Sequence, residues 1–120
     1  MTRDAWHIHS DQGRYVLARQ WPPRFDVAAE TVVPALRRGR LAQQVRQDMW
    51  RALRGLRGFS PVIEIVTNCG GLSLRAGGRV SPGTGTAEIA RRIQTVLDDP
   101  ARRARWFSFA RLTETPPCAR

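Results

Sequence analysis

PVIEIVTNCGGLSLRAGGRV, residues 61–80, contains two runs rich in β-branched and other apolar residues, 61–66 and 72–80, on either side of the sequence TNCGG. Asparagine and glycine between such runs are typical of the tight turn that joins two antiparallel strands. The stretch therefore predicts a β-hairpin and, with it, an antiparallel sheet as the frame of the fold.

A second hairpin is predicted near the N-terminus. The segments AWHIH (5–9) and RYVLARQW (14–21) have the composition of strands and flank SDQG, a tetrapeptide rich in turn-forming residues. The second strand should stop at Pro22 and Pro23, because proline has no backbone N–H to donate to a strand ladder.

The segment between this hairpin and residue 41 carries mixed signals. Asp26 is a suitable N-cap for a helix. Pro34 and Gly39 weaken such a helix internally. We expect a first helical stretch here, with a kink or a break within residues 33–40.

A strong helical periodicity begins at residue 41 and predicts a helix over 41–56. At 100° per residue one arc of 120° collects the apolar side chains, namely Leu41, Ala42, Val45, Met49, Ala52, Leu53 and Leu56. The opposite side collects polar ones, namely Arg40, Gln43, Gln44, Gln47, Arg51 and Arg54. Gly55 and Gly58 end the helix, and its apolar face should pack on the sheet.

Two further helices are predicted in the C-terminal third. The first follows SPGTGT (81–86), and its apolar residues recur at helical spacing, namely Ile89, Ile93, Val96 and Leu97. Asp99 and Pro100 form an N-cap and first-turn pair, so the second helix should begin there and continue through ARRARWFSFARL.

The order of these elements is β-β-α-β-β-α-α, which indicates an α+β fold: a small antiparallel sheet of two β-hairpins covered on one face by helices. A chain of 120 residues fits one domain. We place this domain at residues 1–112 and expect residues 113–120 to form a flexible C-terminal tail.

The charge of the chain indicates an anionic partner. Twenty arginines and no lysine stand against ten acidic residues, giving a net charge of +10. Choosing arginine over lysine leaves the net charge unchanged, but the positive sign implies attraction to polyanions. No run of eighteen apolar residues is present, and MTRDAWHIHSDQ lacks the apolar region of a signal peptide. We therefore expect no membrane partner and a cytoplasmic location.

Much of this charge lies in residues 37–57, where seven arginines face a single acid, Asp48. Charged helix faces usually alternate in sign, so that side chains four residues apart form ion pairs. Self-repulsion on this scale is better tolerated when an anion binds. The candidate binding residues are Arg37, Arg38, Arg40, Arg46, Trp50, Arg51, Arg54 and Arg57.

Trp50 lies outside the apolar arc, about 120° from its centre, with arginines on both sides. An aromatic ring between guanidinium groups suits single-stranded nucleic acid, whose bases stack on rings while arginines follow the phosphates. Large aromatic side chains are more often buried. We therefore expect a neighbouring element, such as the C-terminal helix, to cover this ring.

The leading hypothesis is a small, non-catalytic protein that binds nucleic acid, DNA or RNA, through the arginine-rich helix face. The alternative is an adaptor or small subunit that docks an acidic protein partner through the same face. Both partners require a basic surface with an aromatic anchor, so the sequence does not separate them. It does not determine the oligomeric state either.

A third hypothesis is a regulator that binds a small anion or a nucleotide at Gly83, Thr84, Gly85 and Thr86. Backbone N–H groups and the helix dipole attract anions at such a turn. The glycine spacing is not that of a P-loop, and no lysine follows. We expect a plain turn followed by a threonine N-cap.

The sequence contains no catalytic signature, and we expect neither enzymatic activity nor a cofactor. His7 and His9 alternate on a predicted strand and should share its open face, with too few partners for a metal site. Cys69 is expected as a reduced thiol in a turn, and nothing nearby in the sequence would activate it as a nucleophile.

Overall fold

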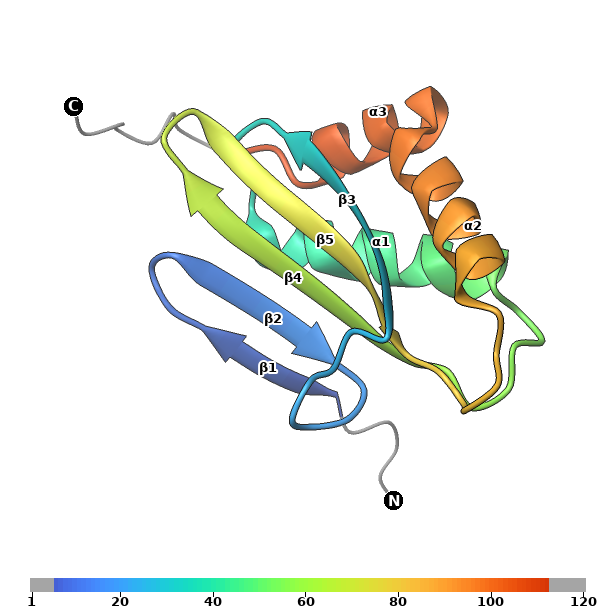
Figure 1. Cartoon of the computed structure of the whole chain (residues 1–120). Helices are drawn as coiled ribbons and strands as arrows, with labels where there is room; N and C mark the ends of the chain where they lie inside the picture. Colours follow the sequence, from blue (N-terminus) through green and yellow to red (C-terminus); the bar gives the residue numbers. More distant parts are fainter. Residues whose placement is uncertain (1–5, 113–120) are drawn as a thin grey trace, which may run out of the picture.

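The computed structural model describes residues 6–112; residues 1–5 and the predicted tail 113–120 lie outside the described part of the chain (Figure 1). Its elements confirm the α+β fold class and the predicted order of hairpins and helices. They are β1 (His7–Ser10), β2 (Arg14–Ala18), β3 (Val27–Val33), α1 (Arg38–Ala52), β4 (Ser60–Asn68), β5 (Gly71–Arg79), α2 (Thr86–Asp98) and α3 (Pro100–Phe109).

The strands form one five-stranded antiparallel sheet in the order β1-β2-β4-β5-β3. Both predicted hairpins are present, and β2 joins them by pairing Leu17 with Ile63. The three helices lie on one face of this sheet (Figure 1). The buried side chains between the two layers form the main core, and the apolar face of α1 packs on the sheet as predicted.

Strand β3 corrects the expectation of a helical stretch after Asp26. It pairs with β5 along its whole length, from Val27 opposite Gly78 to Val33 opposite Leu72. Four of its seven residues are β-branched, so edge pairing with β5 outweighs the local helix signal.

Asp26 does not act as an N-cap. Its carboxylate accepts hydrogen bonds from Arg24 and from the Val80 backbone N–H, and these bonds, Arg24 first, lower its pKa.

Helix α1 has the predicted rotational phase. Leu41, Val45 and Met49 are buried against the sheet, whereas Arg40 and Gln47 are exposed. The helix ends at Ala52 rather than at residue 56. Leu56 follows in a turn, and is only half-buried.

Helices α2 and α3 begin where the sequence places them, but one cap differs. The Asp99 side chain caps α3 by accepting a hydrogen bond from the Arg102 backbone N–H, as predicted. Gly85 is the N-cap residue of α2, and no side chain caps this helix. The expected threonine cap is therefore wrong. The Thr84 backbone N–H closes the preceding turn on Ser81 instead.

Replacing Gly77 with alanine is expected to lower the free energy of unfolding by about 1 to 3 kcal/mol. A Cβ atom at this position would lie 2.0 Å from the Val27 carbonyl oxygen and 2.7 Å from the Ala28 Cα, so β3 would have to move away from β5. Gly13→Ala is the matched control, because a Cβ there meets no heavy atom within 4 Å. Urea denaturation of both variants measures the difference, and equal stabilities would contradict the close approach of the two strands.

No helix within residues 6–112 is long and apolar enough to cross a membrane. The cytoplasmic location stays a prediction.

Candidate nucleic-acid interface

Most acidic residues outside α1 face an arginine of their own region. These ion pairs lie on the open sheet face, in the β2–β3 connection and on α2 and α3. They join Arg14 with Glu64, Arg75 with Glu30 and Glu64, Arg24 with Asp26, Arg91 and Arg92 with Glu88, and Arg102 with Asp99. The folded chain therefore neutralises much of its charge away from α1.

Asp48, the single acid of residues 37–57, points inward. Asp48 is 2% exposed, and its carboxylate accepts a hydrogen bond of 2.7 Å from Trp106 Nε1. Arg105 of α3 and Arg51 of α1 donate to the same carboxylate. The acid thus connects α1 to α3, and these two guanidinium groups share its single negative charge. Within residues 6–112 no other carboxylate pairs with an arginine of residues 37–57.

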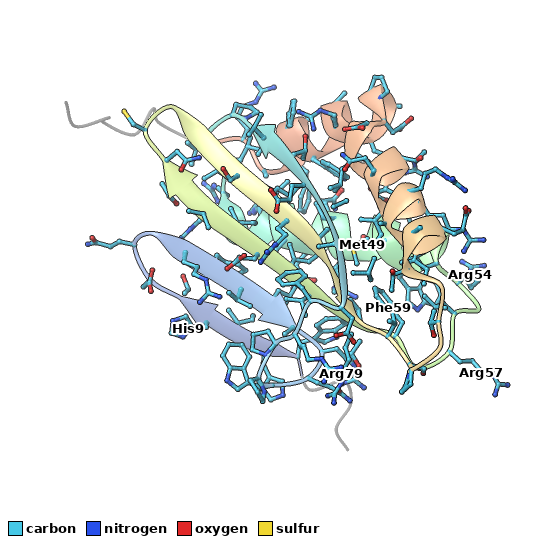
Figure 2. The ribbon with its side chains drawn as sticks, in the orientation of Figure 1. His9, Met49, Arg54, Arg57, Phe59 and Arg79 are labelled. Atoms are coloured by element: carbon cyan, nitrogen blue, oxygen red, sulfur yellow. The ribbon has the colours of Figure 1, made fainter. Side chains whose placement is uncertain are left out.

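Six of the seven arginines between 37 and 57 form no ion pair with a carboxylate within residues 6–112. Four of them lie over aromatic rings. Such a cation–π contact leaves the guanidinium charged and holds it in one orientation. The distances from guanidinium carbon to ring centroid are 5.8 Å for Arg38 and Tyr15, 5.4 Å for Arg40 and Phe109, 4.9 Å for Arg46 and Trp6, and 4.7 Å for Arg54 and Trp50. Figure 2 shows Arg57 projecting away from the body of the protein.

Tyr15 beneath Arg38 does not offset its charge. Burial raises the pKa of Tyr15 above its ordinary value, although the neighbouring Arg38 acts in the opposite direction. The phenol therefore stays neutral near pH 7. Arg38 also donates a hydrogen bond of 3.2 Å to Ser10 Oγ, which places it on the β1–β2 side of α1.

Trp50 is exposed, with 59% of its surface accessible, so the expected cover by the C-terminal helix is wrong. Helix α3 contacts α1 through Trp106 and Asp48, and Arg105 reaches Gln44 on the same side. The opposite flank of α1 is left open. There Trp50 lines a shallow hollow together with Arg46, Gln47 and Arg51.

The predicted binding residues lie along α1 but not on one face. Arg38 and Arg46 lean toward the β1–β2 hairpin, and Arg40 and Arg51 lean toward α3. Trp50 and Arg54 lie between these flanks. Arg37 precedes the helix, where its backbone N–H donates to Ala110, and Arg57 follows the helix in the connection to β4. The result is a positive surface that runs the full length of α1.

The turn at residues 83–86 is less suited to an anion than α1. Gly83 adopts a left-handed conformation with φ 85°, and Gly85 is the N-cap residue of α2. Glu88 occupies the first turn of the helix, where its carboxylate already interacts with the positive end of the helix dipole. Anion binding at Gly83, Thr84, Gly85 and Thr86 stays a prediction.

His7 and His9 share the open side of β1, and both rings lie beside Trp21, at centroid distances of 6.1 and 6.3 Å. Within residues 6–112 no three His, Cys, Asp or Glu side chains cluster as a metal site would require. Cys69 is disulfide-bonded, so the expected reduced thiol is wrong and the residue offers no thiolate. Cys118 lies outside the described residues.

Two tryptophans of this region were not among the predicted site residues. Trp6 and Trp21 come from separate segments, and no local sequence pattern connects them to α1. Only the folded chain brings Trp6 under Arg46 and Trp21 beside β1.

Comparison of the chain with protein-family models, with curated proteins and with solved structures found no match.

Proposed function

We propose that the protein binds nucleic acid through the arginine-rich surface of α1. The observation that supports this proposal is the segregation of charge: most described acids elsewhere have arginine partners, whereas six arginines between 37 and 57 have no carboxylate partner within residues 6–112. Such a surface gains free energy when phosphates replace solution counterions.

The shape of the surface suits a chain of phosphates better than a single small anion. Helix α1 has fifteen residues and is about 22 Å long. Arg37, Arg38 and Arg40 lie at its start, Arg46 in its middle, and Arg54 and Arg57 beyond its end. Several phosphates at regular spacing can contact these positions together, while a small anion would use only one or two of them.

The salt dependence of binding tests the proposal. The log–log slope of affinity against salt should be about −0.7 to −0.9 per phosphate neutralised, for DNA or RNA oligonucleotides followed by fluorescence anisotropy. Arg57→Gln should reduce the magnitude of that slope by about one unit and weaken all sequences alike. Arg57 suits this purpose because its side chain is exposed and forms no side-chain hydrogen bond or ion pair with another residue of 6–112, so the substitution removes charge alone.

Arg92→Gln is the matched control, because it removes the same charge from α2, where Arg92 faces Glu88. It should leave the slope nearly unchanged. An equal effect of both variants would mean that net charge, and not the α1 surface, governs binding. Failure to bind any single- or double-stranded DNA or RNA at low salt would overturn the proposal, and the surface would then be either a docking face for an acidic protein or only the solvated side of a helix.

A further inference from the structure

The positive surface of α1 continues around the edge of the sheet. Arg46 lines the hollow that contains Trp50, and its guanidinium also lies 4.9 Å from the ring centroid of Trp6. Trp6 in turn lines a second hollow, whose other residues are His7, Ile8, His9 and Trp21. Arg46 and Trp6 therefore join the two hollows into one path.

This path collects three of the four tryptophans of the chain. Trp50 and Trp21 are 59% and 46% exposed and lie at its two ends. Trp6 lies between them and carries two guanidinium groups over its ring, those of Arg46 and Arg19. The fourth tryptophan, Trp106, is buried in the core. Two open aromatic rings with cations between them match the alternation of bases and phosphates in an extended strand.

The path also bends around an edge strand. β1 is one of the two edge strands of the sheet, and the second hollow is lined by residues from both of its sides: Ile8 on the helix side, and His7 and His9 on the open side. A duplex, with a persistence length of about 50 nm, is too stiff to follow such a bend readily. The faces of its bases are also stacked inside the duplex and cannot stack on a tryptophan ring. A single strand is flexible enough to follow the bend and exposes the faces of its bases.

We propose that this path, the Trp50–Trp21 track, binds single-stranded nucleic acid, with bases stacked on Trp50 and Trp21 and the phosphate between them held by Arg46. The proposal rests on the proposed function and deepens it by naming the form of nucleic acid. It also assigns a binding role to two segments outside α1, the N-terminal strand and the β2–β3 connection.

The test compares single-stranded oligonucleotides with the duplex of the same sequence, by anisotropy at fixed salt. The wild-type protein should bind the single strand more tightly. Trp50→Ala and Trp21→Ala should each weaken single-strand binding by about 5- to 150-fold, which is the affinity lost when one base no longer stacks on a ring. Neither substitution should change the salt dependence of binding, because neither removes a charge. Trp21→Phe should restore most of the loss, because phenylalanine keeps a stacking face.

Phe109→Ala is the matched control. Phe109 is 47% exposed and lies beneath an arginine, Arg40, but at the end of α3 and away from the track. Its removal keeps the charge of Arg40 and takes no stacking surface from the track, so single-strand affinity should fall far less than in Trp50→Ala or Trp21→Ala. Circular dichroism of each variant verifies the fold, and a variant that loses binding while folded supports the proposal.

Two results would overturn the track while leaving the proposed function in place. One is equal, salt-dependent binding of single strand and duplex. The other is a folded Trp21→Ala variant that binds single strands as tightly as the wild type, because the path beyond α1 would then be unused. Absence of any nucleic-acid binding at low salt would overturn both proposals together.

Discussion

Asp48→Ala is expected to lower the free energy of unfolding by about 3 kcal/mol, at the lower end of the range for removing one partner of a buried ion pair. The substitution leaves Trp106 Nε1 buried without an acceptor, in a side chain with no exposed surface. Arg105 and Arg51 would lose their partner too, but both are about half exposed and regain water. Because water solvates these two guanidinium groups, the expected loss in the free energy of unfolding lies below the upper end of that range.

Chemical denaturation with two companion variants checks this prediction. Asp48→Asn should cost less than Asp48→Ala, because the amide oxygen can still accept from Trp106. Asp98→Ala removes a carboxylate on α2 whose one hydrogen-bond partner among the described side chains is Gln94. This variant should change the free energy of unfolding by no more than about 0.5 kcal/mol. A loss below about 1 kcal/mol for Asp48→Ala would show that the carboxylate does not hold α3 against α1.

Met49→Ala is expected to lower the free energy of unfolding by about 2 to 5 kcal/mol. Met49 is 1% exposed and lies between α1 and the sheet, where Figure 2 places it in the interior. The substitution removes apolar contacts and leaves a cavity that the packed layers can only partly close. Thermal or urea unfolding measures the loss.

Leu56→Ala provides the comparison for Met49. The helical wheel places both side chains in one apolar arc, but α1 ends before Leu56, which is only half-buried. Its truncation should therefore cost clearly less. Equal losses would mean that the helix extends to residue 56 as the sequence predicts, and a neutral Met49→Ala would contradict the packing of α1 on the sheet.

The candidate site was predictable in part. The excess of arginine over acid between 37 and 57 is a property of the sequence, and helical periodicity is sufficient to place Trp50 outside the apolar arc. Whether that ring is covered was not predictable, because it depends on which flank of α1 receives α3. The buried bond from Trp106 to Asp48 fixes α3 on the other flank.

Periodicity and turn chemistry account for the two hairpins, the phase of α1 and the Asp99 cap of α3, because each depends on neighbours a few residues apart. Tertiary structure decided what depends on distant partners. Residues 27–33 form a strand because β5 offers an unpaired edge at that position, and the pairing outweighs a weak local helix signal. Trp6, Arg46 and Trp21 come together only when β1 pairs with β2 and forms one edge of the sheet. Local sequence sets which faces are apolar or charged, and long-range packing determines which of those faces meet and which stay open to a partner.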